Sequence, residues 1–193
     1  MDSEKLRALL EAVRSGTTSV ENAAAQMSNL PIDSVGDFAN LDTHRAMRRG
    51  FPEVIFGQGK TVEQISAIFS RLAAHNSTVM ATRITPEQAA ALQPLLPEAV
   101  YHPTARILYR HTPPVQPREG ILVLCAGTTD IPVAEEAALT AELMGNQVER
   151  AYDVGVAGLH RLLERLPKLR SARVLVVAAG MEGALPSVVA GLV

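Results

Sequence analysis

Two uninterrupted apolar runs, each followed by a glycine-bearing turn, constrain the fold of this sequence more than any other feature. Residues 121–125 read Ile-Leu-Val-Leu-Cys and residues 174–178 read Val-Leu-Val-Val-Ala. A strand without polar alternation is buried on both faces, which is typical of parallel sheets covered by helices. Helical patterns follow the first run from Pro132 to Met144 and the second run from Pro186. The second half of the chain is therefore predicted to be a parallel α/β domain.

Between these runs, residues 147–152 are predicted to form a strand and residues 156–166 a single helix. The sheet would then have three strands, and the sequence stops at Val193 inside the last helix. Sheets commonly have more strands than this. We therefore expect the domain to be incomplete at its C-terminal end.

A proline-rich segment at residues 112–118 marks the best domain boundary. It contains three prolines, which remove hydrogen-bond donors and fix φ, so an extended linker is predicted. The linker divides the chain into an N-terminal domain, residues 1–111, and a C-terminal domain, residues 119–193.

The N-terminal domain is predicted to be a small α/β domain. A helix is expected at residues 3–14, and a second one ends near Met27. A connector at residues 31–38 follows. The expected later strands lie at residues 54–56, 78–82 and 106–109, with one more near Tyr101. Helices are expected to begin after Thr61 and at Pro86, and the helix after Thr61 buries Ile65, Ile68, Phe69 and Leu72.

Composition and charge exclude several classes of protein. Only 4% of residues are aromatic and 47% are hydrophobic, which favours Ala, Val and Leu packing in an α/β fold over a β-sandwich. A net charge of −2 gives no electrostatic basis for binding nucleic acid or an anionic membrane. The single cysteine cannot form an internal disulfide, and no signal peptide or membrane span is evident. A soluble, cytoplasmic protein is predicted.

The first candidate site is the turn Gly-Thr-Thr-Asp at residues 127–130, which follows an apolar strand. In open α/β sheets, ligands bind beyond the carboxyl ends of strands. Gly127 permits a tight turn, and the Thr128 and Thr129 hydroxyls with the next helix N-terminus can hold an anion. Asp130 would either cap the next helix or protrude from the turn. Thr129 and Asp130 could instead serve only as helix caps, and the spacing leaves both interpretations open.

The second candidate site is the turn Gly180-Met181-Glu182-Gly183 after the other apolar run. Its two glycines bracket a carboxylate that could act as an acid or base or bind a cation. A plain glycine turn with a solvated Glu182 is the alternative interpretation.

A third candidate is a concentration of charge that begins at Asp42. Arg45 and Arg48 lie three residues apart, so in a helical turn they share a face and could hold a phosphate. Glu53 and Lys60 follow in the same stretch. Asp42 and Glu53 could orient the arginines, or the group could form a salt-bridged surface without a ligand.

The remaining reactive side chains do not predict further sites. The five histidines are too scattered to predict a metal site. Cys125 ends an apolar strand, so it is predicted to be buried and inert.

These segments resemble the PurE-like carboxylases. Residues 127–133, Gly-Thr-Thr-Asp-Ile-Pro-Val, resemble the Gly-Ser-x-Ser-Asp-x-Pro-Val turn of the purine carboxylase PurE, where the turn holds substrate phosphate and the Asp lies in the active site. Residues 179–186 resemble the PurE segment ending Ala-Ala-His-Leu-Pro-Gly, but the catalytic His of PurE falls on Ala184. This departure argues against ordinary aminoimidazole ribotide chemistry.

The closer resemblance is to the LarB family. Gly-Met-Glu-Gly-Ala-Leu-Pro-Ser at residues 180–187 is the form typical of LarB. Leu-Asp-Thr-His-Arg at 41–45 and Arg-x-Gly-x-Pro-Glu-Val-Ile-Phe-x-x-Gly-Lys-Thr at 48–61 also match that family. The resemblance covers residues 3–193. It implies a PurE-like three-layer αβα parallel sheet preceded by a small α/β domain.

The resemblance implies a reaction. The pyridinium ring of nicotinic acid adenine dinucleotide is carboxylated by carbon dioxide or bicarbonate, and its phosphoanhydride is then hydrolysed to AMP and a biscarboxylated mononucleotide for nickel-pincer cofactor synthesis. A thiolate adding to the electron-poor ring makes a ring carbon nucleophilic, and Mg²⁺ is implied for the diphosphate. Asp130 and Glu182 are the implied catalytic residues. The implied substrate-binding residues are Asp42, Arg45, Arg48, Glu53, Lys60, Gly127, Thr128, Thr129, Gly180, Met181 and Gly183.

Three further expectations come from the resemblance. The nucleophilic cysteine of the family lies beyond Val193, and Cys125 does not match its position, so a chain ending there is expected to be inactive. PurE-like domains assemble as octamers with sites at subunit contacts, so a homo-octamer is expected. Some members are known as circadian phase modifiers, which makes a regulatory nucleotide-binding scaffold the alternative function.

Overall fold

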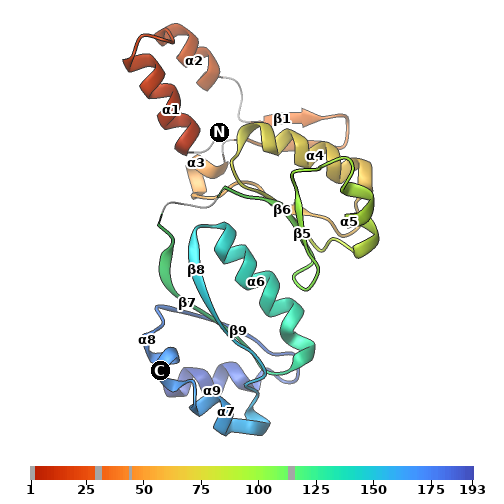
Figure 1. Ribbon diagram of the computed structural model, residues 1–193, viewed down its shortest axis with the longest axis vertical. Coiled ribbons are helices and arrows are strands. Elements are labelled where there is room, and N and C mark those ends of the chain that lie inside the picture. The colour runs from red at the N-terminus through yellow and green to blue at the C-terminus, as the bar shows by residue number, and fades with distance from the viewer. Residues whose placement is uncertain (1–2, 29–31, 44, 113–115) are drawn as a thin grey trace. The chain divides into compact units, whose positions relative to one another are not determined.

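The computed structural model describes residues 3–28, 32–43, 45–112 and 116–193. The chain divides into two compact units (Figure 1): unit 1 contains residues 1–101 and 108–112, and unit 2 contains residues 102–107 and 113–193. His44 of the Leu-Asp-Thr-His-Arg motif and residues 113–115 of the proposed linker lie outside the described residues. Among the described residues, no helix combines the length and apolarity needed to cross a bilayer.

Unit 1 carries a small mixed sheet. Its elements are α1 (Ser3–Arg14), α2 (Val20–Ser28), β1 (Ile32–Val35), β2 (Ala39–Asp42), α3 (Arg45–Arg49), β3 (Ile55–Phe56), α4 (Val62–His75), β4 (Val79–Thr82), α5 (Pro86–Leu92), β5 (Val100–His102) and β6 (Ile107–Arg110). The four-stranded sheet has the order β3-β4-β6-β5. Strand β3 runs parallel to β4, and β6 runs antiparallel to it.

Helix α4 is the main support of this sheet. Thr61 caps it, and the Thr61 and Gln64 side chains form a reciprocal capping box that satisfies two backbone N–H groups. The four apolar residues expected to be buried, Ile65, Ile68, Phe69 and Leu72, are at most 5% exposed. The sequence-based prediction of this helix and its buried face is confirmed.

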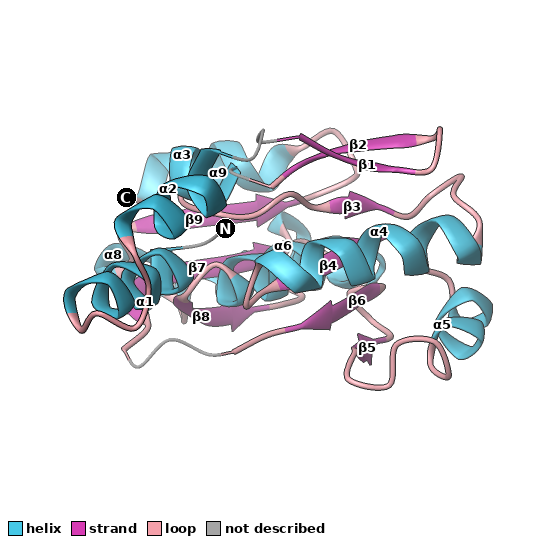
Figure 2. Ribbon diagram, turned by 90° about the horizontal axis from the view of Figure 1, so that it is seen from above, coloured by secondary structure: helices cyan, strands magenta, loops and turns pink. Residues whose placement is uncertain are grey.

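The sequence-based prediction of a connector at residues 31–38 is wrong over the described residues. Strands β1 and β2 form an antiparallel hairpin (Figure 2), in which Val35 pairs with Ala39 across a turn at Gly36, where φ is +55°. Each strand has four residues, too few for a period-two pattern to stand out. Val35 and Leu41 hold the hairpin by packing into the core of unit 1.

Unit 2 is a parallel α/β layer structure. Its elements are β7 (Arg118–Cys125), a 3₁₀ turn (Thr128–Asp130), α6 (Ile131–Leu143), β8 (Asn146–Ala151), a second 3₁₀ turn (Val156–Gly158), α7 (Leu159–Leu163), α8 (Leu166–Ser171), β9 (Val174–Ala178) and α9 (Ala184–Leu192). The strand order is β8-β7-β9, and all pairs are parallel. Arg118, placed in the linker from the sequence, begins β7.

Strand β7 is buried on both faces, as its apolar run predicts. On one face Val123 and Cys125 pack with Ala134 and Ala138 of α6. On the other face Leu122 and Leu124 pack with a cluster drawn from α7, α8 and α9, namely Leu162, Leu169, Leu185 and Val189. Helices therefore cover both faces of the sheet, and the predicted αβα class is confirmed (Figure 1).

The sequence-based prediction of a single helix at residues 156–166 is wrong. The chain instead makes a 3₁₀ turn, the short helix α7 and a new helix, α8. Pro167 explains the break, because its ring removes a donor and is tolerated only in the first turn of a helix, where it lies in α8. Gly158 at the start of α7 separates the preceding turn from the helix.

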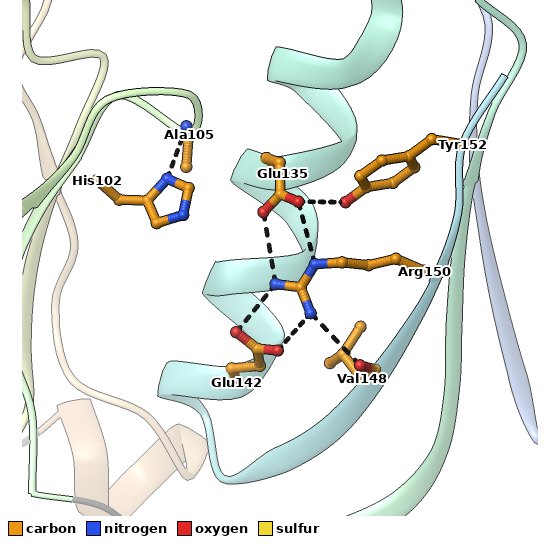
Figure 3. A network of polar contacts seen from close by, with 7 residues as sticks. All are labelled: His102, Ala105, Glu135, Glu142, Val148, Arg150 and Tyr152. Carbon is orange, nitrogen blue, oxygen red and sulfur yellow. Dashed lines mark hydrogen bonds and ion pairs between the residues drawn. The ribbon is translucent and has the colours of Figure 1, made fainter.

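A cluster of polar side chains joins α6 to the edge strand β8 (Figure 3). Arg150 donates from Nη1 to Glu142 Oε1 at 2.6 Å and from Nε to Glu135 Oε1 at 3.1 Å. The Tyr152 hydroxyl donates to the same Glu135 oxygen at 2.7 Å. Burial acts to raise the pKa of Glu135, but the hydrogen bonds from Tyr152 and Arg150 outweigh it and the pKa is lowered. The cluster thus favours an ionised Glu135.

We expect Tyr152→Phe to lower the free energy of unfolding by about 1 to 2 kcal/mol at neutral pH, because a hydrogen bond to a charged acceptor is lost. The pKa of Glu135 is lowered in the folded state, so the contribution of its ionised form is present above the ordinary carboxylate value of about 4.3 and disappears as the pH falls below it. Urea unfolding from neutral to acidic pH measures the difference.

The matched control is Tyr109→Phe, whose hydroxyl has no hydrogen bond to another described residue. An equal loss in the control, or a loss for Tyr152→Phe that persists in acid, would contradict this account.

Candidate functional site

The loops that follow β7, β8 and β9 meet at the carboxyl end of the sheet in unit 2. Ala126 donates its backbone N–H to Ala178 O at 3.1 Å, which joins the first loop to the end of β9. Val154 donates to Cys125 O at 3.0 Å and Gly155 to Ala126 O at 2.8 Å, which joins the first loop to the loop after β8. Ligands of open α/β sheets bind at this end.

Asp130 links the two predicted glycine turns. Its Oδ2 accepts the Gly127 N–H at 3.0 Å, and its Oδ1 accepts the Gly180 N–H at 3.1 Å. A Cβ on Gly180 would lie 3.3 Å from that Oδ1, tighter than most real contacts, so glycine suits this approach. Both carboxylate oxygens are engaged, so Asp130 is a positioning residue in this structure. Its role as an acid or base stays a prediction.

The hydroxyls of the first turn remain available to a ligand. Thr128 and Thr129 are exposed, and α6 has no side-chain cap hydrogen bond. The capping interpretation therefore does not describe Thr129, while Asp130 closes the turn through Gly127. Two hydroxyls that have no partner within the described part of the chain, beside a helix N-terminus, are suited to an anionic group.

The second turn carries an exposed carboxylate on a strained backbone. Glu182 has φ of +32°, and Gly183 follows with φ of +63°. A left-handed conformation is costly for a residue with a Cβ, and such strain concentrates at functional sites. Met181 beside it is 83% exposed. Among the described residues, no hydrogen bond or ion pair engages the Glu182 carboxylate, so its role as an acid, a base or a cation ligand stays a prediction.

The sequence analysis missed a third set of residues, which follows β8. Asp153 has φ of +55° and forms an ion pair with Arg161. A Cβ on Gly155 would lie 2.7 Å from the backbone oxygen of Ala126, so this position needs glycine. A Cβ on Gly158 would lie 2.6 Å from Arg161 Nε, which the flexible arginine side chain can relieve by moving. The sequence does contain another glycine-bearing turn after a strand. Part of this turn was assigned to the helix predicted at residues 156–166, so it was not identified as a candidate site.

Cys125 has the buried character that the sequence predicts. Its side chain is 0% exposed, and burial raises the pKa of its thiol. A protonated, inaccessible thiol is a poor nucleophile.

The charged segment of unit 1 forms a separate group, which is described by itself. Arg48 pairs with Asp42, whose backbone N–H donates to Glu53 Oε2 at 2.8 Å. The Arg45 guanidinium lies over the Phe51 ring, 5.4 Å from its centroid. Within the described residues, Asp42 Oδ1 and Arg45 Nε are buried without a hydrogen-bond partner. The salt-bridge interpretation therefore fits Arg48 but not Arg45.

Neither group is a ready metal centre. Among the described residues, no three His, Cys, Asp or Glu side chains come together in a way that could hold a metal ion. At the end of the sheet, the Asp130 oxygens accept N–H groups and Asp153 pairs with Arg161.

Comparison with known proteins covers both units. The family described as the LarB/PurE-like N-terminal domain matches residues 32–112. The uncharacterized protein MJ0165 of Methanocaldococcus jannaschii is 35% identical over 199 residues, an alignment that covers 98% of this chain and 78% of that protein. The first match includes the charged segment, and the second also spans the turns of unit 2.

We expect Asp130→Asn to lower the free energy of unfolding by about 1 to 3 kcal/mol, because an amide offers one acceptor oxygen where the carboxylate offers two. Either Gly127 or Gly180 then loses its acceptor. Urea unfolding measures the loss, and hydrogen exchange of the two glycine amides locates it. Asp37→Asn, at an exposed position in the hairpin turn of unit 1, is the control. Unchanged exchange at both glycines would contradict the linking role.

Gly155→Ala is expected to cost about 1 to 3 kcal/mol, because the new Cβ would meet Ala126 O at 2.7 Å and one of the two loops must move. Gly191→Ala in α9 is the matched control, since a Cβ there has no neighbour within 4 Å and alanine favours the helix. Thermal unfolding of the two variants should shift in opposite directions. Equal shifts would show that the close approach of the loops is not limiting.

Proposed function

This chain belongs to the LarB family of PurE-like carboxylases, and from that membership we propose that it carboxylates the pyridinium ring of nicotinic acid adenine dinucleotide. The observation that carries the proposal is Asp130, which holds the glycine turns after β7 and β9 together. The turns then present Thr128, Thr129 and Glu182 at one end of the parallel sheet.

The chemistry needs an electron-rich ring carbon, which a pyridinium ring lacks. A thiolate that adds to the ring forms a C–S bond and moves the electron pair onto the ring, where a carbon can attack carbon dioxide. Loss of the proton from that carbon and departure of the thiolate then restore the aromatic ring. Glu182 is the proposed acceptor of this proton, because its carboxylate is exposed at the open end of the sheet.

The thiolate in this proposal is not Cys125, which is buried and has a raised pKa. The family resemblance places it beyond residue 193. Thr128 and Thr129 are proposed to hold a phosphate of the dinucleotide, with the N–H groups at the start of α6. This arrangement would fix the substrate while the phosphoanhydride is cleaved to AMP.

Mg²⁺ is proposed to enter the site already bound to the phosphates of the substrate. The described residues do not offer three side chains for a metal of their own. Mg²⁺ binds phosphate oxygens and keeps several waters, so a dinucleotide complex needs few protein ligands.

An oligomer, with the octamer of PurE-like domains as the proposed form, is supported by exposed apolar side chains around the open end of the sheet. Val133, Leu159 and Met181 are between 42% and 83% exposed. Such side chains are commonly covered at subunit contacts.

The test is incubation of a purified protein that contains the proposed cysteine, as verified by intact mass, with nicotinic acid adenine dinucleotide, labelled bicarbonate and magnesium. We expect equal amounts of AMP and labelled mononucleotide. Glu182→Gln should lower the rate by about 100-fold, as loss of a general base does. Cys125→Ala, which keeps this buried position apolar, and the exposed control Glu164→Gln should leave it unchanged. Binding of the dinucleotide without carboxylation would contradict the proposal and favour a regulatory scaffold.

A further inference from the structure

Unit 1 contains a pocket that the carboxylation chemistry leaves unexplained. Its volume is about 320 Å³, within the range of small-molecule sites. It lies between the β1–β2 hairpin, β3 and the start of α4. Its polar lining consists of Asn40, Glu53, Lys60 and Gln64, and its aromatic lining of Phe38 and Phe56.

Lys60 has a fixed backbone and a free side chain. Its N–H donates to Gly57 O at 3.0 Å, and its carbonyl accepts from Gln88 Nε2 at 3.1 Å. The Gly57 N–H donates in turn to Thr82 O at 2.8 Å, and a Cβ on Gly57 would collide with the Ile84 side chain. Although Lys60 is half-buried, its ammonium makes no ion pair or hydrogen bond with another described residue. A positioned, unpaired cation indicates an anionic ligand.

Each of the other polar side chains of the pocket makes one hydrogen bond and keeps a further donor or acceptor without a partner among the described residues. Asn40 Oδ1 accepts from Ser34 Oγ at 2.8 Å, and Gln64 Oε1 accepts from the Thr61 N–H at 3.1 Å. Both amide NH₂ groups are therefore left without a partner within the described part of the chain. Glu53 uses Oε2 for the Asp42 N–H, which leaves Oε1 as an acceptor. The pocket thus offers two neutral donors, one acceptor and one cation.

Two aromatic side chains flank these polar groups. Phe38 is 45% exposed and Phe56 is 55% exposed. Exposed aromatic rings beside directional polar groups suit a planar ring that carries its own donors and acceptors.

We propose that this pocket binds the adenylate part of an adenine nucleotide. The Glu53 carboxylate accepts a hydrogen bond from the 6-amino group of adenine, and the Asn40 and Gln64 amides donate to nitrogens of the adenine ring. The Lys60 ammonium forms an ion pair with the phosphate. A ring that bears a carboxylate, such as nicotinate, is disfavoured because Glu53 repels it. The proposal rests on the proposed function, since it names where the unreactive half of the dinucleotide binds.

The proposal is tested by calorimetric titration of the whole chain without bicarbonate, using AMP, adenosine, purine riboside monophosphate and nicotinic acid mononucleotide. AMP should bind best. Removal of its phosphate or of its 6-amino group should each weaken binding by about tenfold, the effect of one charge-assisted hydrogen bond.

Two variants locate the site. Lys60→Gln should abolish the preference for AMP over adenosine, while Phe56→Ala should weaken both ligands by a similar factor. Lys168→Gln, which removes the same charge from unit 2, and Leu95→Ala, at another exposed apolar position of unit 1, are the matched controls. Circular dichroism verifies that each variant is folded.

The outcomes separate this proposal from the carboxylase assignment. Failure of AMP to bind, unchanged AMP binding in both variants, or tighter binding of nicotinic acid mononucleotide would overturn the adenylate pocket. AMP binding that responds to both variants, in a protein that never carboxylates the dinucleotide, would support the pocket and remove only the proposed reaction.

Discussion

Burial of β7 on both faces is the constraint on which unit 2 depends. Leu122 and Leu124 pack toward the helices on one side, and Val123 and Cys125 pack toward α6 on the other. A polar residue at any of these positions would be buried without a partner, which is costly. Because β8 and β9 pair in parallel with this strand, all three strands end at the same edge. The open end of the sheet and its loops are a consequence of that packing.

The loops at that edge are held by backbone contacts and by one carboxylate. Asp130 joins Gly127 to Gly180, which lies 50 residues beyond Asp130 in the chain, and Gly155 lets the loop after β8 approach Ala126. This rigid arrangement maintains non-glycine residues with positive φ at two loops, Asp153 and Glu182. Strain of this kind persists only where the surroundings support it. The arrangement leaves hydroxyls and a carboxylate free, as a PurE-like carboxylase would need.

In unit 1, as in unit 2, local contacts satisfy the backbone while some polar side chains have no partner among the described residues. The turn before α4 is held through Gly57, Thr82 and the Gln88 side chain, yet the Lys60 ammonium has no ion pair or hydrogen bond with another described residue. Glu53, which also lines the pocket, uses one oxygen to hold the β2 end, and its other oxygen has no hydrogen bond to another described residue. In both units the backbone is satisfied by local contacts while selected side chains are left free. The two proposed roles, chemistry in unit 2 and adenylate binding in unit 1, follow from which groups remain free.

Features that depend on neighbours in the chain can be predicted from the sequence: the capped helix after Thr61, the buried run that became β7, the buried Cys125 and the positions of two glycine turns. Periodicity and caps are local, so residues 61–75 and 121–125 show them directly. Pro167 and the glycines after β8 are local signals too, but the prediction of one helix at residues 156–166 did not use them. Tertiary packing sets the β1–β2 hairpin and the link between Gly127 and Gly180 through Asp130. The pocket around Lys60 belongs to the same group. These features depend on which distant segments come into contact. Strand order and packing determine those contacts, and no local sequence pattern encodes them.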